Sequence, residues 1–301
     1  MAISKRKKKK RSTPYLIVFI CIVCLVYEVA TRMLSPGGEG ASSGGNRQSP
    51  FPGDRQESVA PANAGHPAAD KTRLELPAQM KGVPELILHR KGYTVSYNRK
   101  LKIANWVAWE LTPEKLVERE SRTNKFLPDP DLPEHEAVTT DDYKASGMDR
   151  GHLCPSGDNR WHWKAMQESF YMTNICPQDH NLNRGDWKEL EEKCREWARK
   201  EEKIYIVCGP ILYRQKHRTI GRQHKVTVPE AFFKVILCAD SRPPKAIGFL
   251  YKNTSGNHPL DSYVYTVDDV ERITGIDFFP TLPDEVEEKV EAKYDLKQWR
   301  Y

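Results

Sequence analysis

The chain has 301 residues, enough for one large domain with extensions, and it shows no internal repeat that would indicate a repeat architecture. Its 47 Lys and Arg residues exceed its 41 Asp and Glu residues, which gives a formal net charge of +6. A mildly basic balance suits a polyanionic partner. It does not require one, because part of the excess lies in the first eleven residues.

The N-terminus combines a basic cluster with an apolar run. Seven Lys and Arg residues occupy positions 5–11, and thirteen apolar residues follow from Tyr15 to Tyr27. This is short for a spanning helix, which needs about 20 residues, but no small-x-small cleavage site follows it. We therefore expect residues 1–34 to form an uncleaved signal anchor rather than a cleaved secretory signal. The basic flank would stay cytoplasmic, so the rest of the chain would lie outside the cytoplasm, in a bacterial periplasm or at a cell surface. A basic nuclear-localisation or nucleic-acid-binding tail is the alternative, and the apolar run argues against it.

Residues 35–80 are expected to form a flexible linker, because they are rich in Gly, Ser, Pro and Ala and have few large apolar side chains. The folded domain is then expected over residues 81–301. It contains five cysteines (Cys154, Cys176, Cys194, Cys208 and Cys238). An odd number leaves at least one without an intramolecular partner, and the spacing does not give a disulfide connectivity.

Apolar patterning predicts the main elements of this domain in chain order. Strands are expected over residues 105–111, 170–175, 203–208, 232–238 and 246–251, and helices over 186–202, 267–274 and 285–293. The segment 149–159 contains Gly and Pro and is expected to be irregular. This mixture, without a βαβ regularity, indicates an α+β domain.

The helix over 186–202 places chemistry on one face. An apolar stripe at helical spacing is formed by Trp187, Leu190, Cys194 and Trp197. Asn183, Trp187 and Glu191 are spaced four residues apart, so they are expected to share one helix face. A carboxylate beside the stripe is either a half-exposed edge residue or one held there for a function. For Asn183 the alternative to a functional role is a purely structural one, as the N-cap of the helix.

The most specific motif is the segment 149–152, Asp-Arg-Gly-His, which Asn174, Asn183 and Glu191 follow within forty residues. An imidazole base, a guanidinium and a few oxygen ligands are the groups that phosphodiester hydrolysis by water needs when a metal ion carries the charge.

These residues resemble the sugar-nonspecific DNA/RNA endonucleases with a ββα-metal active site, a family of secreted bacterial and mitochondrial nucleases. The resemblance covers nearly the whole domain in the right order and rests on segments 149–156, 170–178, 183–191, 228–234 and 274–280. It implies an α+β fold with a mixed or antiparallel sheet. It also implies hydrolysis of DNA and RNA without sequence specificity, giving 5′-phosphate products.

The resemblance also implies the roles of individual residues. His152 matches the general base, and its second ring nitrogen needs a partner that the sequence does not show. Asn183 matches the family's sole direct protein ligand to Mg²⁺ or another divalent cation such as Mn²⁺. Glu191 matches the residue that orients metal-bound water, and Asn174 a supporting catalytic amide. Arg150 and Arg122 match residues that bind the substrate phosphate.

Further expectations concern partners. DNA and RNA are the expected substrates, and the segment 214–225, with five Lys or Arg and two His, is a candidate contact for the phosphate backbone or else a solvated loop. The membrane is an expected partner through the N-terminal segment. The mitochondrial intermembrane space is the alternative location, because related nucleases occur there. The oligomeric state stays open, with a homodimer as one candidate.

Two alternative functions remain at this stage. His152, Cys154, Cys176 and His180 have spacings that fit a structural zinc module, which conflicts with a free base at His152. The second alternative is a membrane-anchored nucleic-acid receptor with an inactive nuclease-like domain. The presence of His152, Asn183 and Glu191 together argues against it.

Overall fold

The computed structural model describes residues 73–254 and 256–299, and all of them belong to one compact unit. The predicted anchor at Tyr15–Tyr27 lies outside these residues, and no described helix is both long and apolar enough to cross a membrane. The described chain begins inside the predicted linker. Leu74, Leu76 and Met80 pack against the hydrophobic core, so this stretch is part of the domain surface.

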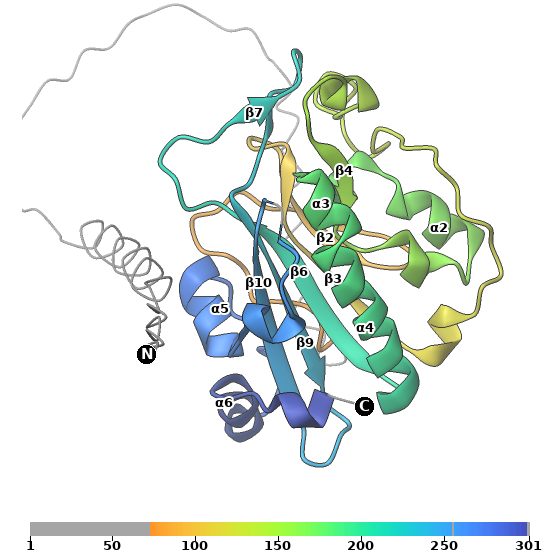
Figure 1. Ribbon diagram of the computed structural model, residues 1–301. Helices are drawn as coiled ribbons and strands as arrows, with labels where there is room; N and C mark the ends of the chain where they lie inside the picture. The colour runs from red at the N-terminus through yellow and green to blue at the C-terminus, as the bar shows by residue number, and fades with distance from the viewer. Residues whose placement is uncertain (1–72, 255, 300–301) are drawn as a thin grey trace, which may run out of the picture. The chain divides into compact units, whose positions relative to one another are not determined.

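A seven-stranded sheet forms the centre of the domain (Figure 1). Each pair of neighbouring strands is antiparallel. The spatial order is β1 (Leu86–His89), β2 (Thr94–Asn98), β3 (Ile103–Leu111), β6 (Ile204–Ile211), β9 (Ala231–Cys238), β10 (Lys245–Lys252) and β11 (Val264–Tyr265). This confirms the α+β class with an antiparallel sheet.

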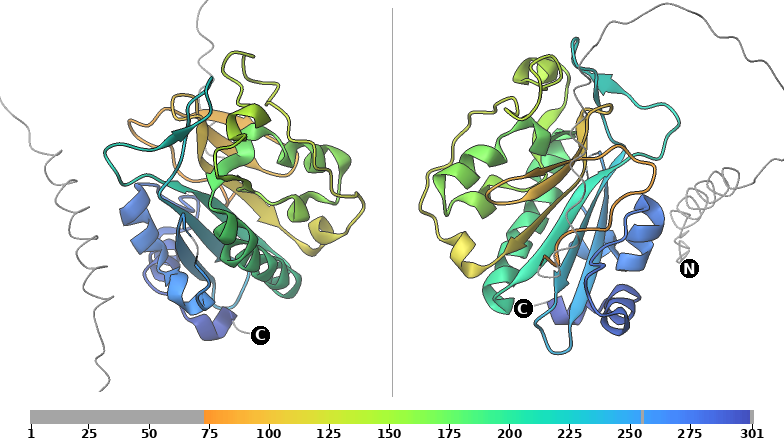
Figure 2. Two further views of the ribbon diagram at one scale, coloured as in Figure 1. Left: turned by 45° about the horizontal axis from the view of Figure 1, so that its top comes forward. Right: turned by 180° about the vertical axis from the view of Figure 1, so that it is seen from behind.

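Helices cover both faces of the sheet, as the views in Figures 1 and 2 show. Strand β9 is buried along its whole length, so its side chains alternate between two cores. On one side Phe232 packs with Trp187 of helix α4 (Asp186–Glu201). On the other side Phe233 packs in the core that holds α5 (Val267–Thr274) and α6 (Asp284–Glu291).

The remaining elements are short. They comprise α2 (Trp163–Ser169), α3 (His180–Arg184), a two-stranded sheet of β4 (Asp149–His152) and β5 (Ile175–Gln178), a second one of β7 (Thr219–Ile220) and β8 (Val226–Thr227), and the 3₁₀ helices η1 (Pro113–Leu116), η2 (Thr140–Tyr143), η3 (Ser156–Asn159), η4 (Met172–Asn174), η5 (Leu260–Tyr263) and η6 (Leu296–Trp299).

Most predicted elements are confirmed, and the errors lie around the motif. The strand predicted over 170–175 is wrong, because Phe170 caps α2 and residues 172–174 form η4. Strand β5 starts at Ile175 and includes Pro177. A two-stranded sheet tolerates this proline, because only one edge of each strand forms backbone hydrogen bonds and the other edge needs no N–H donor. All five cysteines of the domain are buried and free, so none of them forms a disulfide.

Candidate active site

The motif segment 149–152 is strand β4 of a compact ββα unit. It pairs antiparallel with β5, with His152 opposite Ile175, and the chain then enters α3. Asp179 caps this helix, since its side chain accepts hydrogen bonds from the backbone N–H groups of Asn181 and Leu182. The expectation of irregular structure over 149–159 is therefore wrong for its first four residues.

The glycine of the motif is required by close packing between these two strands. A Cβ at Gly151 would lie 2.2 Å from Oε1 of Gln178 and 2.7 Å from its Cβ. The side chain of Gln178 is buried and passes directly over this position. Any larger residue at position 151 would push β4 away from β5 and displace His152 next to it.

The His152 imidazole lies between two aromatic rings. Its centroid is 4.7 Å from that of Phe170, edge to face, and 5.5 Å from that of Phe126. Its Nε2 is buried and has no hydrogen-bond partner among the described residues. Burial is the main reason that the pKa of His152 falls to about 3, and the charges of Arg122 and Arg150 lower it further. The ring is therefore neutral at physiological pH.

A cleft of about 420 Å³ lies beside this strand and brings together three of the predicted residues, Arg122, Arg150 and Asn183. The guanidinium carbon of Arg150 lies 4.4 Å from the Phe126 ring centroid, and that of Arg122 lies 5.7 Å from the Phe170 centroid. The rings that flank His152 thus also hold both arginines by cation–π contact. Both arginines are exposed, so their charges can meet an anion that enters the cleft.

Asn183 is oriented by the first residue of the motif. Its Nδ2 donates a hydrogen bond of 2.9 Å to Oδ2 of Asp149. Because the amide nitrogen is engaged, the carboxamide oxygen of Asn183 is left free to act as a ligand. Asp149 also contacts His180 and Arg184. The pKa of Asp149 is lowered, because these contacts and the hydrogen bond from Asn183 outweigh the opposing effect of burial.

Asn183 and Glu191 lie on two different helices, so the prediction that they share one helix face is wrong. Gly185 separates α3 from α4 with φ −105° and ψ −113°. A Cβ at Gly185 would lie 2.6 Å from the backbone oxygen of Asn181, which makes glycine necessary at this junction. The apolar stripe of α4 is confirmed, since all four of its residues are buried.

The charges of Glu191 and Lys234 influence each other without a direct ion pair among the described residues. Glu191 is half-buried on α4, and burial raises its pKa to about 7 against the opposing effects of Lys234 and Arg195. Lys234, on β9, is fully buried, and its Nζ has no hydrogen-bond partner among the described residues. Burial alone would lower the pKa of Lys234, but nearby thiols, Glu191 and Asp158 raise it, so the ammonium stays charged.

Trp187 connects this buried lysine to the motif. Nζ of Lys234 lies 4.3 Å from the Trp187 ring centroid. The indole Nε1 of Trp187 donates a hydrogen bond of 3.3 Å to the backbone oxygen of His152. Lys234 thus supports the strand that carries His152 through one side chain, while its charge acts on Glu191.

Asn174 is fully buried, and its contacts are all with the backbone. Its Oδ1 accepts a hydrogen bond from the Cys154 N–H, and its Nδ2 donates to the carbonyls of Cys154 and Ser169. These bonds fix the chain two residues after His152. The side chain therefore positions the motif strand and has no free group to offer to a substrate.

The four residues of the zinc alternative do not converge. Among the described residues, the ligand atoms of three or more His, Cys, Asp or Glu residues lie within 4.8 Å of one another only in the group Asp268, Glu271 and Glu291. His152 packs against Phe170, and His180 contacts Asp149. The zinc-module hypothesis is therefore not supported by the arrangement of these side chains.

The basic segment 214–225 is fastened to the loop that leads into β4. Arg218 donates a hydrogen bond of 2.6 Å to the backbone oxygen of Ser146. Nδ1 of His224 lies 2.6 Å from Oδ2 of Asp142, and both side chains are buried. Arg222 and Lys225 are exposed, so the segment presents positive charge from a fixed position rather than from a free loop.

The comparisons with known proteins agree with this geometry. The family model described as DNA/RNA non-specific endonuclease matches residues 77–285. The chain belongs to the DNA/RNA non-specific endonuclease family. It is 35% identical over 206 residues to the mitochondrial nuclease EXOG of Xenopus laevis, covering 64% of this chain and 57% of that protein. It is also 32% identical over 216 residues to the mitochondrial endonuclease G of Homo sapiens, covering 67% of this chain and 72% of that protein.

A solved structure, the crystal structure of the EndoG/EndoGI complex, has a similar fold. It matches with a TM-score of 0.61 and 27% identity, covering 67% of this chain and 89% of that chain. The chain spans less than two thirds of the length of the EXOG relative it matches.

Sequence reasoning missed two contributors to the site. Lys234 appears in a strand of eight buried residues, and the signal that could have found it is a single charge inside an apolar run. The second contributor is Asp149, whose carboxylate accepts a hydrogen bond from Nδ2 of Asn183. No periodicity reveals that contact, because it joins residues 34 positions apart.

Proposed function

We propose that this family member is a metal-dependent endonuclease that hydrolyses phosphodiester bonds of DNA and RNA without sequence specificity. The observation that carries the proposal is the neutral imidazole of His152, held beside two exposed arginines at a cleft that also contains Asn183. A neutral base and a positively charged surround are what water attack on a phosphodiester needs.

The residues of the cleft fit a hard divalent cation such as Mg²⁺ or Mn²⁺. The oxygen of Asn183 is free because its nitrogen donates to Asp149, and the carboxylate of Asp149 adds negative charge nearby. One amide oxygen suits an ion that keeps most of its waters. A cation bound there would offset the negative charge that develops on the phosphate and on the leaving 3′-oxygen.

The other residues bind, orient and move protons. Arg150 and Arg122 bind the scissile phosphate, and His152 accepts the proton of the attacking water. The phosphate's negative charge offsets the two guanidinium charges, so substrate binding raises the pKa of His152 and makes it a stronger base. Glu191, which is half-buried on α4 and does not line the cleft, would orient a water of the bound cation, and Asn174 positions the strand. The products carry 5′-phosphate ends.

Replacement of His152 tests the proposal. His152→Ala is expected to lower the rate of cleavage of both DNA and RNA at least ~100-fold, because general-base catalysis contributes about 10²–10⁴-fold. Nucleic-acid binding should be retained, since both arginines remain. The matched control is His135→Ala, an exposed histidine whose only described partner is Glu136. The second candidate function is a nucleic-acid receptor without catalytic activity. Equal rates of cleavage by the wild type and by His152→Ala would overturn the assignment of His152 as the general base.

The location and assembly belong to the same proposal. The named mitochondrial relatives support the mitochondrial alternative over a bacterial envelope. The membrane anchor stays a prediction from the sequence, as do the homodimer and the phosphate contacts of segment 214–225. Proteolysis of intact organelles, with sequencing of the mature N-terminus, distinguishes an anchored chain from a processed one.

A further inference from the structure

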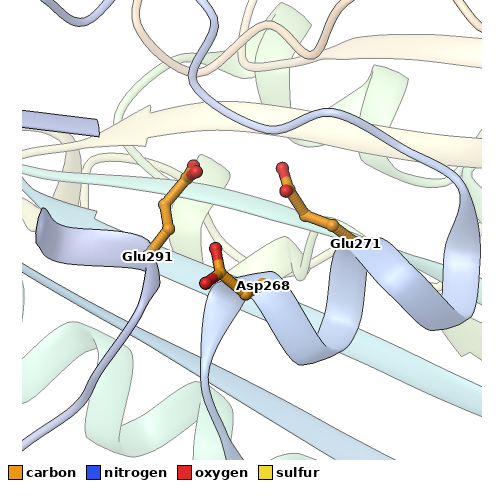
Figure 3. A group of neighbouring side chains, drawn as sticks. All are labelled: Asp268, Glu271 and Glu291. Atoms are coloured by element: carbon orange, nitrogen blue, oxygen red, sulfur yellow. The ribbon is translucent and has the colours of Figure 1, made fainter. Parts of the chain in front are cut away.

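Three acidic side chains converge on the face of the sheet opposite the ββα unit (Figure 3). Asp268 and Glu271 are three residues apart on α5 and share one face of that helix. Glu291 is the last residue of α6. Figure 3 shows all three side chains projecting into a common space, and their ligand oxygens lie within 4.8 Å of one another.

The buried member of this group lacks a partner. Glu291 has 5% of its surface exposed, and its Oε1 has no hydrogen-bond partner among the described residues. A buried, unsatisfied carboxyl oxygen is costly, so such a group calls for an explanation. Glu271 accepts one hydrogen bond, 2.7 Å from the Phe278 N–H to its Oε1, which leaves Oε2 free.

The electrostatics also show that this cluster lacks positive charge. Burial, together with the neighbouring carboxylates of Glu271, Glu287, Asp268 and Asp277, raises the pKa of Glu291 to about 9. Burial likewise raises the pKa of Glu271 to about 7. The neighbouring Arg272 does not relieve this strain of like charges, because it pairs with Asp269.

We propose that Asp268, Glu271 and Glu291 form a binding site for a divalent cation of the Ca²⁺ type, separate from the catalytic metal. Oxygen-only ligands indicate a hard cation, and bonds of about 2.3–2.6 Å to calcium can bridge oxygens at this spacing. The tighter octahedron of Mg²⁺, with bonds of about 2.0–2.1 Å, fits the spacing less well. The ion would join α5 to α6 and satisfy Glu291.

This site stabilises the fold rather than taking part in cleavage. Its two helices pack in the core that contains Phe233, whereas Trp187 and the motif pack against the other side of the sheet. Calcium should therefore raise the thermal stability of the chain without replacing the cation at Asn183.

The test uses the full chain carrying Asn183→Ala, which removes the amide proposed for the catalytic ion. Calcium chloride is titrated to about 10 mM while heat of binding and Tm are recorded, since sites with few ligands bind at roughly 10⁻⁴–10⁻³ M. We expect one bound ion and a rise in Tm of about 3–6 °C when the calcium concentration is tenfold above Kd. Adding Glu291→Gln should weaken binding at least ~10-fold and remove the calcium-dependent rise, while Glu285→Gln, an exposed residue of α6, should leave both unchanged.

Asp268→Asn provides a second variant with little risk to folding, because Asp268 is exposed. It should also weaken calcium binding. No calcium-dependent heat and no shift in Tm in the Asn183→Ala chain would overturn the proposal. An equal calcium response in the parent, Glu291→Gln and Asp268→Asn chains would also overturn it, since the ion would then lie elsewhere.

Discussion

The two faces of the central sheet carry opposite charge, yet each holds a titrating group in its neutral form. On the face with the ββα unit, burial and two arginines lower the pKa of His152 to about 3. On the face with α5 and α6, burial and neighbouring carboxylates raise the pKa of Glu291 to about 9. The charges on the first face favour an anion, and those on the second favour a cation.

This difference indicates two kinds of ligand. An anionic phosphate that enters the first cleft offsets the charges of the two arginines beside the neutral His152 ring, and a cation between α5 and α6 favours the ionised form of the carboxyl groups there. The first site stays open to solvent through Arg122 and Arg150, as an enzyme requires. The second is closed over Glu291, as a structural ion site requires.

Asp149→Ala removes the acceptor that orients Asn183. Cleavage should fall by about 10–100-fold, as it does when a partner of a metal ligand is removed, and more Mg²⁺ should be needed for half-maximal rate. The control is Asp141→Ala, an exposed aspartate of η2 that pairs with Lys144. Unchanged cleavage and an unchanged Mg²⁺ requirement would show that Asn183 does not need this partner.

Lys234→Met removes the buried charge that opposes the raised pKa of Glu191. The pKa of Glu191 should then rise above about 7, so the acidic limb of the pH–rate profile should move to higher pH. We expect a loss of roughly 10-fold at pH 7 that is largely recovered near pH 9, since one pH unit is tenfold in the ratio of the two forms. Lys188→Met, on the exposed side of α4, is the control. An equal loss at every pH would mean that Lys234 acts only through packing.

The two faces should respond to pH with opposite signs. The folded-state pKa of His152 is below its ordinary 6.5, so its contribution to stability is present above pH 6.5 and is lost as pH falls toward 3. The folded-state pKa of Glu291 is above its ordinary 4.5, so its contribution is present below pH 4.5 and is lost as pH rises through about 9.

Denaturant unfolding of His152→Gln and Glu291→Gln, without divalent cations, measures both signs. His152→Gln should lose less stability than wild type between pH 6.5 and 4, and Glu291→Gln should lose less between pH 5 and 9. Each group can change the free energy of unfolding by at most ~1.4 kcal/mol per pH unit. Parallel stability curves for wild type and either variant would contradict the shifted pKa on that face.

Much of the fold was predictable, because the spacing of apolar residues along this chain matches the positions that are buried. The stripe of Trp187, Leu190, Cys194 and Trp197 gave α4, and the apolar run around Phe233 gave β9. Strand β4 was not predictable, because Asp149-Arg150-Gly151-His152 has no alternation and forms only through its pairing with β5. Close contacts across the chain, such as Gly151 with Gln178, do not appear in any local pattern.

The site was predictable in its residues more than in its geometry. The motif and the resemblance pointed to His152, Arg150 and Asn183, which lie in or beside one cleft. The prediction that Asn183 and Glu191 share one helix face is wrong, because α3 ends before Gly185. The buried hydrogen bonds of Asn174 and the cation–π contact of Lys234 with Trp187 are tertiary, so only the structure reveals that these residues act by positioning others.

The most direct test of the central claim is the cleavage rate of Asn183→Ala as a function of Mg²⁺ concentration. If one amide oxygen holds the cation, the Mg²⁺ concentration needed for the half-maximal rate should rise. The rate at about 1 mM Mg²⁺ should fall at least ~100-fold, which is more than the loss expected when the hydrogen-bond partner of the ligand, Asp149, is removed. Asn181→Ala, on the same helix α3, should stay within about twofold of wild type, as expected away from the site. A wild-type rate and an unchanged Mg²⁺ requirement in Asn183→Ala would contradict the account.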